Sequence, residues 1–235
     1  MKVVVLNDDG TYYGTDAVAI HYDGWKTEYF ILNQDGDFER IFEYTQNKKQ
    51  IEKRVFVFDA DLEENFPHYV EDGSYEGYPT FIKNKNLLEK IRKGEKEIID
   101  WVGMTFYNCS YFDVDNEKIV DDAHGCKVLN NFAGGFHDAV IINYNYDDKK
   151  NCLYIDLDGV WGLEKLTLIF EDVLKYHIED DYEYNYFSIA NLFYEDEEVC
   201  FVNDECNTKN DICEEWTFVY AKRLKFEFIF EKPKN

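Results

Sequence analysis

Alternating apolar and polar residues dominate the chain, and this alternation predicts β-strands joined by short turns. In the first third, most of the apolar runs end at turns rich in Asn, Asp and Gly. Asp-Gly steps are typical of hairpins because glycine accepts a positive φ. The runs that we expect to form strands are KVVVL (2–6), AVAIHY (17–22), TEYFIL (27–32), FERIFEY (38–44) and RVFVFDA (54–60).

The same two-residue period returns after Met104 and predicts a second group of strands. Here we expect Val140, Ile142, Tyr144 and Tyr146 to share one face. A strand with one apolar and one polar face is typical of an antiparallel sheet that packs on one side only. The further strands expected are CLYIDLD (152–158), LTLIF (166–170), EVCFVN (198–203), WTFVY (216–220) and RLKFEFIFE (223–231).

The clearest helical pattern covers residues 86–103, where apolar residues recur on one face and Asn86 with Glu89 resembles a capping box. The sequence therefore predicts an α+β protein dominated by an antiparallel β-sheet meander, with one main helix near residues 86–103. We expect an N-terminal β-rich part at 1–103 and a C-terminal antiparallel module at 104–235, with a shared core left open.

Composition and charge narrow the classes of partner. The chain has 235 residues, is 45% hydrophobic and carries a formal net charge of −24. This charge disfavours nucleic acid and anionic membranes and favours a basic protein partner, although an acidic surface can also serve solubility alone. The start MKVVVLNDDG predicts no signal peptide, and no apolar run approaches the roughly 18 residues that span a bilayer. We expect a cytoplasmic protein with free thiols.

Motifs for metal or cofactor binding are not convincing. VLNDDG and ILNQDG resemble calcium loops but place Val5 and Ile31 where the first oxygen ligand belongs. His124 and Cys126 are the closest zinc-ligand pair, yet the other cysteines lack the spacing of a zinc site. The sequence contains no glycine-rich phosphate loop. We expect no metal and no cofactor.

Catalytic signals are equally weak. Asp59 and Asp61 follow an apolar strand, as in aspartate-nucleophile phosphatases, but Leu62 and the lack of alternating strands and helices argue against that class. There is no GxSxG elbow, and no histidine accompanies a nucleophile motif. We expect no enzyme and no catalytic residue; the alternative is an uncharacterised, hydrolase-like enzyme with an acidic pocket.

A His-Asp step, His137-Asp138, directly precedes the strand at Val140. We interpret both residues as structural, because a carboxylate and an imidazole at a strand entrance can satisfy buried backbone groups. The segments GFHDAVIINYNYDD, CLYIDLDGVWG, LTLIFEDV and WTFVYAKRLKFEF, within about residues 134–230, together resemble the β-rich module of YxiG-like bacterial proteins and of similar immunity proteins of polymorphic toxin systems. This resemblance implies a bacterial binding protein without catalysis whose partner is a toxin domain.

Negative charge is densest where carboxylates and tyrosines occur together, in IEDDYEYNYF (178–187) and YEDEEV (194–199). Carboxylates steer a basic partner, and tyrosines provide rigid amphipathic contact area. A solvated acidic loop that contacts nothing is the other interpretation. The residues that we predict to bind the partner are Asp180, Asp181, Glu183, Tyr184, Glu195, Asp196, Glu197 and Glu198.

Overall fold

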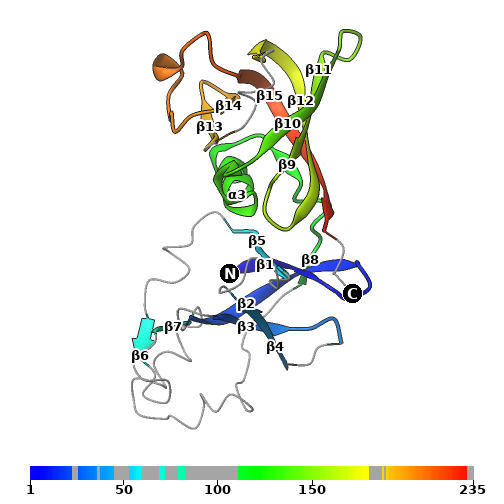
Figure 1. The fold of residues 1–235 in the computed structure, drawn as a ribbon, viewed down its shortest axis with the longest axis vertical. Coiled ribbons are helices and arrows are strands. Elements are labelled where there is room, and N and C mark those ends of the chain that lie inside the picture. Colours follow the sequence, from blue (N-terminus) through cyan, green and yellow to red (C-terminus); the bar gives the residue numbers. More distant parts are fainter. Residues whose placement is uncertain are drawn as a thin grey trace. The chain divides into compact units, whose positions relative to one another are not determined.

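The protein is an α+β protein dominated by two antiparallel sheets (Figure 1). A computed structural model of the chain describes residues 1–22, 26–35, 38–44, 53–59, 69–71, 79–82, 111–179, 187 and 189–231. The helix expected at 86–103 and the boundary expected near Gly103 lie outside the described residues. No helix in the described part of the chain has the length and apolarity needed to cross a membrane.

The chain divides into two compact units. The first contains residues 1–57 and 61–114, and the second contains 58–60 and 115–233. Each unit is built on one sheet.

The first unit contains an eight-stranded sheet in which β2 occupies the centre. β2 pairs with β1 through its first half and with β3 through its second half, and a register shift between Ala17 and Ala19 separates the two halves. Each strand predicted in this region is present. The strands are β1 (Lys2–Leu6), β2 (Tyr12–Tyr22), β3 (Lys26–Leu32), β4 (Phe38–Tyr44), β5 (Val55–Val57), β6 (Tyr69–Glu71), β7 (Pro79–Ile82) and β8 (Tyr111–Phe112).

A buried carboxyl group, Glu43 of β4, fixes the start of β5. Its Oε1 accepts hydrogen bonds from the backbone N–H groups of Arg54 at 2.9 Å and Val55 at 2.8 Å. Burial raises the pKa of Glu43, although these two hydrogen bonds act in the opposite direction. The side chain therefore replaces a neighbouring strand for two backbone donors that would otherwise lack a partner.

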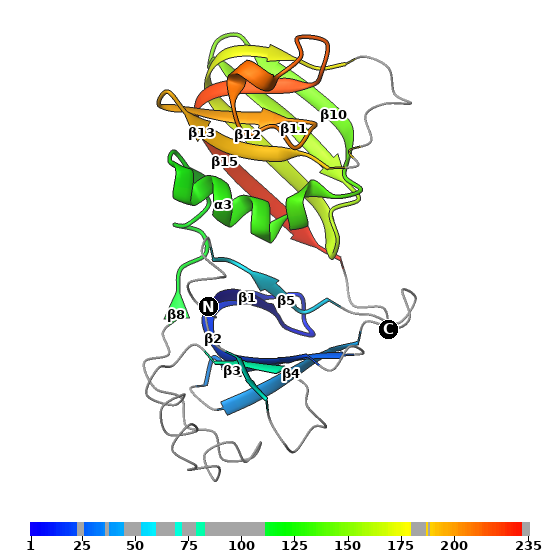
Figure 2. The same cartoon turned by 90° about the vertical axis from the view of Figure 1, so that its left-hand side faces the viewer.

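The second unit is a seven-stranded antiparallel sheet in the order β10-β11-β12-β15-β14-β13, with β9 paired to β15. Figure 2 shows that this sheet curves strongly, with α3 packed beside β13 and β9. Its elements are β9 (Ile119–Val120), α3 (Ala123–Phe132), the 3-10 turn η2 (Gly134–Phe136), β10 (Val140–Asp147), β11 (Cys152–Asp158), β12 (Leu163–His177), β13 (Asn191–Glu195), β14 (Glu198–Val202), the 3-10 turn η3 (Lys209–Asp211) and β15 (Phe218–Phe230).

Alternation along these strands builds the core of the second unit. Leu224 and Phe226 of β15 are buried on one face of the predicted strand. Phe201 of β14 lies among three further rings at 5.5 to 6.0 Å between centroids, those of Phe136, Phe170 and Phe187. WTFVY and RLKFEFIFE, predicted as two strands, contribute to the single strand β15, Phe218–Phe230.

Two features of this unit differ from the sequence prediction. The register shifts between Ile141 and Asn143 of β10, so Ile141 is buried while Ile142 is exposed and no longer shares a face with Tyr144. A β-bulge inserts one residue and exchanges the two faces of a strand, which strict alternation cannot reveal. Helix α3 was not predicted, because its ten residues carry only a short apolar stripe.

Candidate functional site

The predicted residues Glu195, Asp196, Glu197 and Glu198 form the turn of the β13–β14 hairpin. Glu195 pairs with Glu198 across the hairpin, which leaves a two-residue turn. Asp196 and Glu197 have φ values of 54° and 60°, as a type I′ turn requires. The Asp196 side chain is 78% exposed, and Glu197 is also exposed. Two of the four carboxylates therefore lie at the tip, in solvent.

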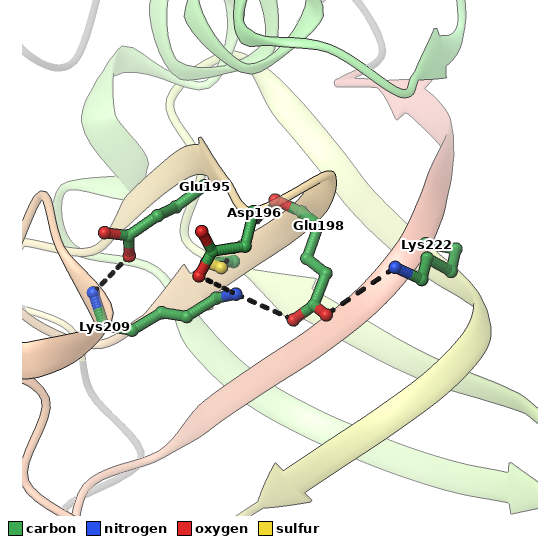
Figure 3. A network of polar contacts seen from close by, with 6 residues as sticks. Glu195, Asp196, Glu198, Lys209 and Lys222 are labelled. Carbon is green, nitrogen blue, oxygen red and sulfur yellow. Dashed lines mark hydrogen bonds and ion pairs between the residues drawn. The ribbon is translucent and has the colours of Figure 1, made fainter.

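Three of the four carboxylates, those of Glu195, Asp196 and Glu198, contact Lys209 of the β14–β15 connection (Figure 3). The backbone N–H of Lys209 donates to Glu195 Oε2 at 2.6 Å. Its Nζ lies 2.8 Å from Glu198 Oε2 and 3.4 Å from Asp196 Oδ2. Lys222 Nζ of β15 lies 3.6 Å from the other oxygen of Glu198. Glu195 is thus held by a backbone N–H group, and Glu198 is held by two lysine ammonium groups of its own chain.

Burial and the neighbouring negative charge shift the pKa of Lys209 in opposite directions. Partial burial alone would lower its pKa, but the hydrogen bond with Glu198 and the neighbouring negative charge hold its pKa above the ordinary value. Lys209 therefore remains charged over the physiological range. Burial also raises the pKa of the neighbouring Cys200 thiol to about 12, so this thiol stays protonated.

The connection between β14 and β15 runs alongside β13 and is hydrogen-bonded to both ends of β13. At the start of β13, Asn191 Nδ2 donates to Cys206 O at 2.8 Å and to Asn207 Oδ1 at 3.0 Å. At its end lies the bond from Lys209 to Glu195. The two attachment points are four residue steps apart, about 13 Å along a strand. Beneath the connection, Cys206, Ile212 and Trp216 pack on the cluster of Phe193, Cys200, Val202 and Phe218.

We call residues 195–198 and 204–215 the acidic edge. Nine of these sixteen residues are acidic, and one, Lys209, is basic. Lys209, Lys222 and Lys175 pair with Asp196, Glu198 and Glu214. The acidic edge therefore keeps a surplus of negative charge on a scaffold fixed by hydrogen bonds.

The side chain of Asn130 on helix α3 is hydrogen-bonded to the free side of β13. Asn130 Nδ2 donates to Leu192 O at 2.7 Å, and Asn130 Oδ1 accepts from Leu192 N at 3.1 Å. The same Nδ2 also donates to Asn191 Oδ1 at 3.0 Å. The amide group thus pairs with Leu192 as a further strand would, and blocks strand addition at this position.

A pocket of about 330 Å³ lies beside this contact, between the end of α3, the start of β13 and the β14–β15 connection. Its polar lining is unusual, because it consists of four asparagines and one carboxylate. Ile189 and Ala190 contribute the apolar part of the wall. The polar residues are Asn130, Asn131, Asn191, Asn207 and Glu205.

His137 and Asp138, predicted as structural residues, lie between η2 and β10. Their side chains are 66% and 54% exposed, and His137 Nδ1 lies 3.0 Å from Asp138 Oδ2. The backbone at this step is attached to Phe187: Asp138 N–H donates to Phe187 O at 3.0 Å, and Phe187 N–H donates to Ala139 O at 2.8 Å. Asp138 also has a positive φ of 66°.

The remaining candidates do not join this site. Asp180, Asp181, Glu183 and Tyr184 lie outside the described residues. Within the described ranges, no group of three or more His, Cys, Asp and Glu side chains is arranged to hold a metal ion. The five cysteines that the structure describes are free thiols.

Sequence reasoning missed the residues that organise the acidic edge. Lys209 is a single lysine in an irregular, acidic segment, and nothing in its neighbourhood indicates two carboxylate partners. The helix that carries Asn130 has weak sequence signals at its two ends. Asp122 caps its start by accepting from Gly125 N–H at 2.7 Å, and Gly134-Gly135 follow its end. These start and stop signals could have placed a helix at 123–132.

Comparison of this chain with protein-family models, with curated proteins and with solved structures finds no match.

Proposed function

We propose that this protein binds a basic protein partner through the acidic edge. The observation that carries the proposal is the fixed presentation of negative charge: Asp196 and Glu197 project at the tip, while Lys209 holds the carboxylates behind them. The net charge of −24 on the whole chain also attracts a basic partner at long range. Charge complementarity of this kind accelerates association and selects the partner.

Preorganisation favours this surface over a flexible acidic loop. Side chains that are already ordered lose less conformational entropy when a partner binds. Glu198 is only 20% exposed and has lysines beside both of its oxygens. It therefore serves as part of the scaffold, and the contact surface is formed by exposed acidic groups such as Asp196 and Glu197.

The resemblance of residues 134–230 to YxiG-like and immunity-type proteins suggests what the partner is. We propose a basic toxin domain, which this protein neutralises by covering it and without turning over any substrate. Such a complex requires tight binding, and steering by exposed carboxylates makes its formation depend on salt concentration.

The test is a charge reversal at the tip with a matched reversal elsewhere. The variant D196K/E197K changes two exposed residues of the acidic edge. The control D148K/E164K changes two exposed residues elsewhere in the second unit, Asp148 in the turn between β10 and β11 and Glu164 near the start of β12. Proteins captured from the native cell by the wild type are identified, and the captured partner is purified for association kinetics with all three forms.

The proposal expects a basic partner whose association at low salt slows at least about tenfold with D196K/E197K and by much less with the control. It also expects the purified partner to lose its toxic activity when mixed with this protein in equimolar amount. Equal association rates for the two charge-reversed variants would refute the acidic edge as the binding surface.

A further inference from the structure

We propose that the asparagine-lined pocket binds a guanidinium group, presented by an arginine side chain of the basic partner. This inference rests on the proposed function for the identity of the partner. The preference of the pocket for guanidinium is a separate property and is measured by itself.

The orientation of the four amides is fixed by backbone carbonyls. The Nδ2 atoms of these side chains each donate to a carbonyl oxygen, and reversing any amide would place its oxygen against that carbonyl oxygen. The four bonds are Asn130 to Leu192 O at 2.7 Å, Asn131 to Asp59 O at 2.6 Å, Asn191 to Cys206 O at 2.8 Å and Asn207 to Glu205 O at 3.1 Å.

Six of the eight amide N–H bonds of the lining thus donate within the protein, and the remaining hydrogen-bonding capacity of the lining is mainly that of acceptors. Both N–H bonds of Asn130 and both of Asn191 have partners within the protein. An amide oxygen accepts two hydrogen bonds, and a carboxylate accepts about four. Asn131 and the exposed carboxylate of Glu205 therefore add oxygen acceptors to the pocket. A ligand that satisfies this lining must be rich in N–H donors.

The charge around the pocket selects a cation. Glu205 belongs to the acidic edge and stands beside Asp204, while Lys209, the basic residue of that edge, is engaged with Glu198 and Asp196. A neutral donor would leave this negative charge uncompensated. A cationic group gains charge-assisted hydrogen bonds, which are stronger than neutral ones.

Among biological cations, guanidinium fits better than ammonium. It carries five N–H donors in a rigid plane and is weakly hydrated, whereas ammonium has three donors and is strongly hydrated. The apolar wall of Ile189 and Ala190 can receive the face of the plane or the methylene stem. A pocket of about 330 Å³ is large enough for an arginine side chain and at the small end for a drug-sized molecule.

The position of the pocket also suits an interface anchor. Asn191 at the start of β13 lines the pocket, and Glu195 at the end of the same strand begins the acidic tip, about 13 Å away. One partner surface of ordinary size covers both. Arginines that fill pockets are among the residues that contribute most to protein interfaces.

The experiment titrates the whole protein with three small probes that differ in one group: acetyl-arginine amide, acetyl-lysine amide and acetyl-citrulline amide. Citrulline has nearly the shape of arginine without its charge. Binding is measured by the NMR shifts of the amide groups of Asn131, Asn191 and Asn207. We expect the arginine probe to bind in the millimolar range, the lysine probe at least threefold more weakly, and the citrulline probe more than tenfold more weakly.

Two exposed substitutions locate the site without disturbing the core. Glu205→Gln should weaken the arginine probe about threefold, as expected for one partly exposed charge contact, and Glu205→Lys should abolish its binding by placing a cation at the rim. D148K/E164K should change binding less than twofold. Equal affinity for arginine and citrulline, or no shifts at the asparagines, would overturn the inference.

Failure of this inference is distinguishable from failure of the proposed function. If the partner depends on Asp196 and Glu197 but the arginine probe does not bind, only the pocket assignment is wrong. If the arginine probe binds but no basic partner depends on the tip, the pocket assignment stands and the proposed function is wrong.

Discussion

Replacing Asn130 with Ala tests whether one side chain closes the free side of β13. The substitution removes two hydrogen bonds to the backbone of Leu192 and one to the side chain of Asn191. It leaves the N–H and C=O groups of Leu192 without their partner, next to a side chain that is buried. Helix α3 itself keeps all of its backbone bonds.

The magnitude follows from two opposing effects. A buried backbone group left without a partner costs about 1–3 kcal/mol, and these contacts are only partly buried, so about 1 kcal/mol for each group is appropriate. Alanine favours a helix over asparagine by about 0.6 kcal/mol, which offsets part of this loss. We therefore expect a net loss of about 1–2 kcal/mol, located at β13.

Hydrogen exchange at the Leu192 amide measures this loss where it occurs, and urea unfolding measures its effect on the whole unit. A loss of 1–2 kcal/mol corresponds to exchange about 5–30 times faster. His124→Ala, an exposed change in the same helix, is the control and should alter stability by less than about 0.5 kcal/mol. Unchanged exchange at Leu192 in Asn130→Ala would refute the edge-closing role of this amide.

Three further predictions concern other groups. Burial holds the pKa of Glu43 above its ordinary value, so between about pH 4 and that raised pKa the folded protein binds more protons than the unfolded chain, and the stability contributed by this group falls as pH rises. The stability of Glu43→Gln relative to the wild type, measured by urea unfolding, should therefore be greater at about pH 7 than at about pH 4.5. A difference that does not change with pH would contradict this. His137→Ala should change the free energy of unfolding by less than about 0.5 kcal/mol, because its side chain is exposed; a loss above about 1 kcal/mol would contradict this expectation. Burial raises the pKa of Cys126 and of Cys200 to about 12. Iodoacetamide at about pH 8 should therefore modify the exposed Cys213 of the folded protein and leave these two buried thiols unmodified, as measured by mass spectrometry. Rapid modification of either buried thiol would contradict the packing around it.

The strands could be predicted because burying one face of a sheet forces a two-residue period on the sequence. This holds for Leu153, Ile155 and Leu157 of β11, which are all buried. The same logic assigned the wrong face to Ile142, because a bulge is a property of the pairing between two strands. Local pattern contains the period but not the register shift.

The site was predictable only in its charge. The sequence shows a dense run of carboxylates at residues 195–198, and the structure places this run in a hairpin turn. The partners of these carboxylates could not be predicted, since Lys209 and Lys222 come from an irregular segment and from another strand. The pocket could be predicted from the sequence even less, because its asparagines come from three separate segments of the chain.

The turn at Asp196 and Glu197 has a consequence for how this hairpin can evolve or be engineered. Both residues hold a left-handed backbone conformation, which costs about 1–2 kcal/mol for each residue that is not glycine and somewhat less for Asp. Asn-Gly, the pair best suited to a type I′ turn, would make the hairpin more stable and would remove both exposed charges. Selection for stability alone would therefore replace the present pair. A variant library sorted for stability should accumulate Asn-Gly at these two positions, whereas a library sorted for partner capture should retain the acidic pair.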